Sequence, residues 1–143
     1  MKSQIQNELT THTDRLAQCA NLFDLVVNAI ETKLSIETVY NKNVKSFQCV
    51  SPSDSNYAYC IFCTYSTMST VQIMVYNHVI KDSPSVCDIV VSHDEENEDI
   101  GRVNTTFNNV PRSIRTELYD LSDYMIDVVD THYNGSTSDE TSL

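Results

Sequence analysis

The sequence predicts an α+β protein in which a helix comes first, an antiparallel sheet follows, and further helices end the chain. Three observations support this order. Apolar residues recur at coiled-coil spacing in the N-terminal segment, alternate with polar residues in short runs through the middle of the chain, and return to helical spacing near the C-terminus. Because strands and helices are segregated along the chain, we expect helices to cover one sheet face and to leave the other available for a partner.

The N-terminal segment has a heptad repeat typical of a coiled coil. We predict a dimerising coiled-coil helix over residues 1–33, with these apolar residues at its seam: Ile5, Leu9, Leu16, Cys19, Phe23, Val26 and Ile30. His12 is the polar seam residue, and such residues often set register. The alternative is a single amphipathic helix on its own domain, which would show a wider apolar stripe. Because the stripe widens from Leu22, we interpret the coil as packing against the globular domain from that point.

The middle of the chain predicts four or five short strands. Apolar and polar residues alternate in LSIETVY, VKSFQCV, YAYCIFCTYS, STVQIMVYNHVI and VCDIVVS. SPSDSN and KDSPS have turn composition, and short connections favour an antiparallel meander. We therefore predict a globular domain over residues 34–134, followed by a disordered tail over 135–143.

Helical spacing returns after the acidic run HDEENED. Four apolar residues share one helical face: Ile100, Val103, Phe107 and Val110. Pro111 ends or begins an element, and RSIRTELY forms a short amphipathic piece. DLSDYMIDVVDTHY predicts a last helix, with Asp120 or Ser122 as its N-cap and Asn134-Gly135 as its stop signal.

Composition disfavours several classes of function. The chain has 143 residues and a net charge of −11, with 20 acidic and 9 basic residues, so it repels phosphate backbones and favours basic partners. No run approaches the roughly 18 apolar residues of a membrane helix. The N-terminus also lacks the layout of a signal peptide, and we expect a soluble intracellular protein.

Cysteines and histidines show no arrangement typical of catalysis or metal binding. The odd count of five cysteines fits a reducing compartment. Cys60 and Cys63 form a CxxC, but they lie in a predicted strand and should face opposite ways, which favours packing over zinc or redox chemistry. The four histidines have no ligand spacing, and two glycines are too few for a phosphate-binding loop. We predict a protein that is not an enzyme and has no cofactor or metal.

Two stretches resemble a known family. They are NLFDLVVNAIETKLSIETV and FNNVPRSIRTELYDLSDYMIDVV, the second containing Val110-Pro111, Ile114, Glu117-Leu118 and the start of the last helix at Leu121. This layout resembles the kinetochore-crosslinking coiled-coil subunit of the fungal monopolin complex, which has a dimerising coil and an RWD-like domain. The chain departs from the family at Asp120-Leu121, where members often have Phe-Pro.

The resemblance implies a nuclear homodimer that crosslinks kinetochore proteins in chromosome segregation, without direct contact to nucleic acid or membrane. It also implies that Ile114, Leu118 and Leu121 line an exposed apolar patch for the partner. The residues alone leave open whether Ile114 and Leu118 form such a patch or belong to the core. Two other readings stay open for the chain: an RWD-like kinetochore subunit acting as a heterodimer, and a small enzyme or effector.

Overall fold

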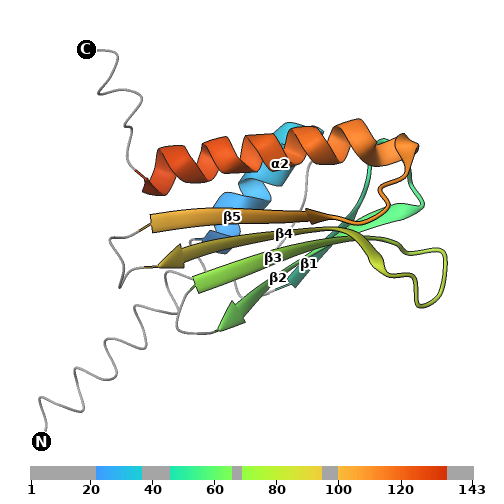
Figure 1. The fold of residues 1–143 in the computed structure, drawn as a ribbon, viewed down its shortest axis with the longest axis horizontal. Coiled ribbons are helices and arrows are strands. Elements are labelled where there is room, and N and C mark those ends of the chain that lie inside the picture. The colour runs from blue at the N-terminus through green and yellow to red at the C-terminus, as the bar shows by residue number, and fades with distance from the viewer. Residues whose placement is uncertain (1–21, 37–45, 66–68, 95–99, 135–143) are drawn as a thin grey trace, which may run out of the picture.

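A single sheet and two helices make up the described part of the protein (Figure 1). The structure, a computed structural model, describes residues 22–36, 46–65, 69–94 and 100–134. Residues 22–34 are helical. The remaining elements are β1 (Ser46–Val50), β2 (Tyr57–Tyr65), β3 (Ser69–Asn77), β4 (Ser85–Asp94), β5 (Ile100–Phe107) and α2 (Arg112–Tyr133).

The five strands form one antiparallel sheet in sequence order, β1-β2-β3-β4-β5. Its register brings Ile73 opposite Ile61 on one side and Ile89 on the other. Sequential strands joined by short connections are the simplest way to satisfy backbone hydrogen bonds in such a sheet. The predicted α+β class and antiparallel meander are therefore confirmed.

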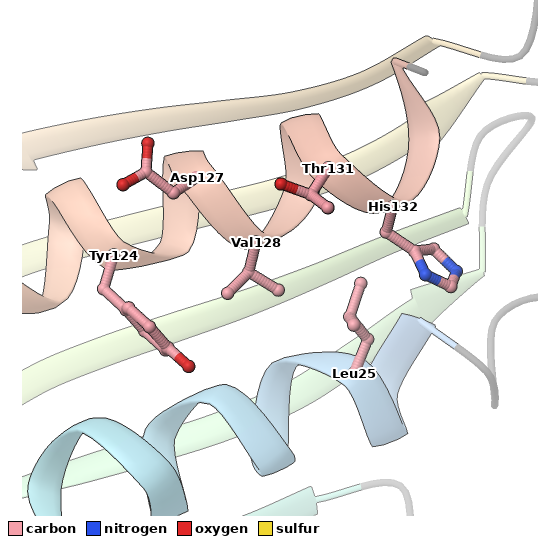
Figure 2. Close-up of a pocket in the computed structure, with 6 residues that line it drawn as sticks. All are labelled: Leu25, Tyr124, Asp127, Val128, Thr131 and His132. Carbon is pink, nitrogen blue, oxygen red and sulfur yellow. The ribbon is translucent and has the colours of Figure 1, made fainter. Parts of the chain in front are cut away.

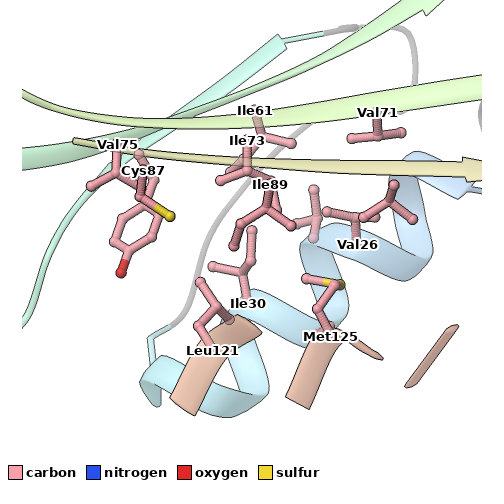
Figure 3. Close-up of a cluster of buried hydrophobic side chains, with 14 of the residues drawn as sticks. Val26, Ile30, Ile61, Val71, Ile73, Val75, Cys87, Ile89, Leu121 and Met125 are labelled. Carbon is pink, nitrogen blue, oxygen red and sulfur yellow. The ribbon is translucent and has the colours of Figure 1, made fainter. Parts of the chain in front are cut away.

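Both helices pack on the same face of the sheet (Figure 1). The core forms where helical residues such as Val26, Ile30 and Met125 meet the strands (Figure 3). The strands contribute alternate residues to it: Tyr59, Ile61, Val71, Ile73, Val75, Cys87, Ile89 and Val91. Each fully buried aliphatic side chain contributes about 1.5–3 kcal/mol, so this layer is the main source of stability.

The segment Ile100–Phe107 is a strand, which corrects the helix predicted there. Its inward side chains are Gly101, Val103 and Thr105, and they alternate with exposed ones. The apolar spacing that suggested a helix was coincidental, because Val103 and Phe107 lie on the helix-facing side of the strand whereas Ile100 lies on the other side. Threonine and asparagine also have low helix propensity, and pairing with β4 decides the conformation.

A second correction concerns the C-terminal helix, which is one element of 22 residues and not two pieces. Pro111 occupies the N-cap position in an extended conformation, and the helix runs through Asp120 and Ser122, the predicted caps. The buried stripe explains this continuity, since Ile114, Leu118, Leu121, Met125 and Val129 follow one helical face. The helix ends at Tyr133 with Asn134 as C-cap, where the stop signal was predicted.

The first predicted strand, LSIETVY, begins differently from the expectation. Leu34 is still helical, and Ser35 is a turn residue with a φ of 55°. The rest of that run lies outside the described residues. In the described part of the chain, no helix has the length and hydrophobicity needed to cross a bilayer.

Candidate functional site

The described part of the predicted dimer seam lies in the core of its own chain. Phe23 is 4 % exposed, and Val26 and Ile30 are fully buried. All three belong to the cluster beneath the sheet, so they do not face a second copy while this packing holds. Their assignment to a dimer interface is thereby corrected, and the physical reason is the wider apolar stripe that starts at Leu22. The other seam residues, Ile5, Leu9, Leu16 and Cys19, lie outside the described residues.

The predicted partner-binding patch is also buried. Ile114 is 1 % exposed, and Leu118 and Leu121 are fully buried against the sheet. A partner cannot contact side chains that have no exposed surface. The assignment of these residues to an exposed patch is therefore wrong, and the alternative assignment to the core is right. Continuity of α2 decides this, because these three residues align with the buried residues farther along the same helix.

The opposite face of the sheet has no described element packed on it, and we call it the open face (Figure 1). Even-numbered residues of β2 and β3 lie here, and Cys60 stands directly opposite Met74 in the register. The apolar residues on the inner strands are half-buried: Cys60, Phe62, Met74, Tyr76 and Val90. At the β1 edge, Val50 is 46 % exposed. The apolar centre of the open face is formed by β2 and β3, and Gln72 separates Phe62 from Val90 on β4 in the register.

The open face is almost free of charge. Among its described side chains, the charged ones are Asp88 and Arg102, which have opposite signs. The Asp88 carboxylate accepts hydrogen bonds from Ser85 Oγ at 2.7 Å and Gln72 Nε2 at 3.4 Å. Gln48 Nε2 donates to the Tyr76 hydroxyl across the same surface. For a chain with a net charge of −11, this neutrality distinguishes the open face from the rest of the surface.

Sequence reasoning expected one sheet face to stay available for a partner, but it did not identify the apolar residues on that face, although a signal was present. A strand covered on one side alternates apolar and polar residues, whereas YAYCIFCTY is apolar at even as well as odd positions. STVQIMVYN also has Met74 and Tyr76 alternating with its inward residues Ile73 and Val75. Apolar residues on both faces indicate a sheet whose second face is covered or binds something.

A hydrogen-bonded network joins the β1–β2 loop to α2 around Glu117. Its carboxylate accepts hydrogen bonds from the Tyr59 hydroxyl at 2.5 Å, from Ser51 Oγ at 2.7 Å and from the Ser53 N–H at 3.1 Å. Burial, together with the hydrogen bond to Glu117, raises the pKa of Tyr59. Nearby, Ser113 Oγ donates to Asp54 at 2.6 Å, which lowers the pKa of that exposed carboxyl. The network is a structural clamp, since Tyr59 is fully buried and open to no substrate.

Two of the described free thiols, Cys49 and Cys87, are not activated nucleophiles. Burial raises the pKa of Cys49 to about 11 and that of Cys87 to about 12, whereas reactive cysteines have lowered values. Cys60 lies on the open face and Cys63 packs against the core, so the predicted divergence of the CxxC pair is confirmed. Cys63 is disulfide-bonded, which departs from the reducing compartment that the odd cysteine count predicted.

A groove separates the helix of residues 22–34 from α2 (Figure 2). It has a volume of about 520 Å³ and is lined by Leu25, Tyr124, Asp127, Val128, Thr131 and His132. Lys33 lies at its side, with Nζ 5.7 Å from the centre of the Tyr124 ring. Figure 2 shows Leu25 from one helix and Val128 from the other pointing into the space between them.

The described residues bring together no group of three histidine, cysteine or acidic side chains that could hold a metal. His78 bonds to the Ser55 carbonyl at 2.6 Å, and His93 stacks on Tyr133 with ring centres 4.2 Å apart. His132 lines the groove and packs edge-on against the same Tyr133 ring, with ring centres 4.6 Å apart.

Comparison of the chain with family models, with curated proteins and with solved structures found no match in any of the three.

Proposed function

We propose that this protein is a non-enzymatic adaptor that forms a homodimer through the open face of its sheet and holds partner proteins on its helical side. The observation that supports the proposal best is the open face itself. Large apolar side chains on neighbouring strands, here Phe62, Met74 and Val90, are typical of a surface that is covered in the working assembly.

Charge favours a second copy as the occupant of the open face. Two copies with a net charge of −11 repel each other, and apposed like charges cost several kcal/mol at an interface. The open face avoids this cost, because its two described charged groups cancel. The exposed carboxylates Asp120, Asp123, Asp127 and Asp130 lie on α2, which covers the other side of the sheet. Contact between open faces keeps these carboxylates far from the interface.

The size of the face is compatible with a stable dimer. Five strands spaced about 4.8 Å apart, each about eight residues long at about 3.3 Å per residue, give a surface of roughly 600 Å². Standard interfaces bury about 600–1,000 Å² on each partner. The open face therefore reaches the lower end of this range without any contribution from other segments.

Within this class we propose a nuclear role as a kinetochore adaptor in chromosome segregation. Its support is the resemblance of the segments around Val110-Pro111 and Glu117-Leu118 to the monopolin subunit, together with the order of helix, sheet and helix. The role needs a partner surface other than Ile114, Leu118 and Leu121, which are buried. The alternatives are a heterodimeric RWD-like kinetochore subunit and a small enzyme or effector.

Sedimentation velocity on two matched variants tests the homodimer. Phe62→Glu places a carboxylate on the open face between Ser46 and Gln72, and we expect it to be monomeric. Ile126→Glu makes the same charge change at an apolar position of α2 that is 42 % exposed, and we expect it to stay dimeric. Circular dichroism checks that both variants keep the fold. A dimeric Phe62→Glu would rule out the open face as the interface.

A third variant distinguishes the open face from the predicted coil. If residues 1–33 form the dimer, Leu16→Asp should give a monomer while Phe62→Glu stays dimeric. We expect the reverse, because the described half of that seam is committed to the core through Val26 and Ile30.

A further inference from the structure

We propose that the groove between residues 22–34 and α2 binds a short, basic, amphipathic helix of a partner protein. This inference deepens the adaptor function and rests on it, in that an adaptor dimerised through its sheet needs a separate surface for its partner. The groove is such a surface, because it lies on the helical side, away from the open face (Figure 1).

The shape of the groove suits a helix of about two turns. Its lining residues on α2 run from Tyr124 to His132, which spans about 12 Å at 1.5 Å per residue. Leu25 and Val128 form apolar walls on opposite sides, and the Tyr124 ring extends the apolar surface (Figure 2). Amphipathic helices bind such grooves with apolar anchors at positions i and i+3, i+4 or i+7. A volume of about 520 Å³ accommodates a few such anchors.

Charge decides which kind of helix binds. Asp127 lines the groove, and Asp120, Asp123 and Asp130 are exposed on the same helix. The helix of residues 22–34 contributes Lys33, whose ammonium lies over the Tyr124 ring. Carboxylates thus outnumber the single amine, so lysine or arginine beside the apolar anchors gains favourable interactions and an acidic segment is repelled. Another copy of this acidic chain is disfavoured for the same reason.

The groove is less suited to a small molecule. Ligand sites of this volume are usually concave and present several convergent polar groups, whereas Thr131 and His132 are exposed at the rim of this groove. An extended apolar floor with an acidic border matches a peptide that has one apolar and one basic face.

The test uses a fluorescent 15-residue peptide of leucine and lysine, with leucines at helical positions i, i+3, i+4 and i+7. Fluorescence anisotropy measures its binding to the full chain. Thr131→Trp fills the groove from an exposed position, and we expect it to weaken binding by about tenfold or more. Asp127→Asn should weaken binding about threefold and reduce its salt dependence, since it removes the carboxylate that lines the groove.

Three controls make the result specific. Asp82→Asn removes the same charge from an exposed position in the turn between β3 and β4, away from the groove, and we expect unchanged binding. A peptide with glutamate in place of lysine, and one with leucine and lysine alternating, should bind at least tenfold more weakly. Equal binding by the native chain and Thr131→Trp would overturn the proposal, as would equal effects of Asp127→Asn and Asp82→Asn.

The experiments distinguish failure of the groove proposal from failure of the homodimer proposal. Phe62→Glu lies on the open face, so it should bind the lysine peptide as the native chain does. A monomeric native protein that binds this peptide through the groove would contradict the homodimer and support the groove. A dimer whose peptide binding ignores Thr131→Trp would support the homodimer and contradict the groove.

Discussion

At the residue scale, Glu117 links three parts of the fold. Its carboxylate on α2 receives hydrogen bonds from Tyr59 in β2 and from Ser51 and Ser53 in the β1–β2 loop. The cost of leaving a buried hydroxyl without a partner exceeds the usual gain from one hydrogen bond. Glu117 is therefore worth more to stability than its half-buried position suggests.

We expect Glu117→Ala to lower the free energy of unfolding by about 2–3 kcal/mol, because the hydroxyls of Tyr59 and Ser51 lose their acceptor. Glu117→Gln keeps one acceptor oxygen and should cost less. Urea unfolding measures both, with exposed Thr116→Ala as the control in the same turn. If Glu117→Ala is as stable as the native chain, the network has no structural role.

Alkaline pH should destabilise the fold through its buried thiols. Burial raises the pKa of Cys87 from 9.0 to about 12, so the folded state keeps its proton where the unfolded state loses it. The contribution is present below pH 9 and is lost as pH rises through the window from 9 to about 12, by on the order of 2 kcal/mol at pH 10.5. Burial raises the pKa of Cys49 to about 11, so this thiol also lowers stability as the pH rises towards that value.

Urea unfolding at pH 8 and pH 10.5 tests this expectation. Cys87→Ala should show a smaller loss between the two pH values, whatever its stability at pH 8. A pH slope as steep in Cys87→Ala as in the native chain would mean that this thiol does not contribute.

At the element scale, β5 and α2 pack closely because Gly101 of β5 has no side chain. A Cβ atom on Gly101 would lie 2.7 Å from Val129 Cγ1 and 2.9 Å from Tyr133 Cβ. Asn134 then fastens the helix end, because its side chain accepts from the Gly101 N–H at 2.8 Å and donates to the Gly101 carbonyl at 3.0 Å. Farther along, Thr105 and Ser122 hydroxyls are 2.8 Å apart.

Gly101→Ala should destabilise the protein by about 1–3 kcal/mol, since the added methyl group forces α2 away from β5. Asn104→Ala, at an exposed position of the same strand, is the control and should change little. Thermal unfolding followed by circular dichroism measures both. Native-like stability of Gly101→Ala would mean that the helix end is not held this close to the strand.

Whether an element was predictable from the sequence depended on which kinds of side chain lie on its buried face. Strands β1 to β4 were predictable from alternation, because their odd-numbered residues meet the helices. β5 was not, since its inward residues Gly101 and Thr105 are small or polar and fit against α2 without an apolar signal. The continuity of α2 across Asp120 was hidden by residues that resemble caps. Packing against residues distant in sequence determines both the strand conformation of β5 and the continuity of α2.

The candidate surfaces were less predictable than the fold. Burial of Ile114 and Leu118 depends on which way α2 faces, and a short motif does not specify this. The groove requires Leu25 and Val128, about a hundred residues apart in sequence, to lie on neighbouring helices. Neither relationship is readable from local spacing.

At the scale of the whole molecule, charge and apolar surface are divided between two sides. The sheet side is apolar and nearly neutral at its open face, and the helical side bears Asp120, Asp123, Asp127 and Asp130 around the groove. A dimer joined at the open faces would point two grooves outward. Two weak sites on one dimer bind a partner with two copies of the segment far more tightly than either site alone.

The homodimer is tested most directly by the solution mass of the native chain, measured by light scattering at several concentrations. We predict a mass near twice 16.2 kDa at high concentration, falling towards 16.2 kDa on dilution if the contact is limited to the open face. A mass that stays at 16.2 kDa at every concentration would contradict the homodimer and with it the adaptor function proposed for the chain.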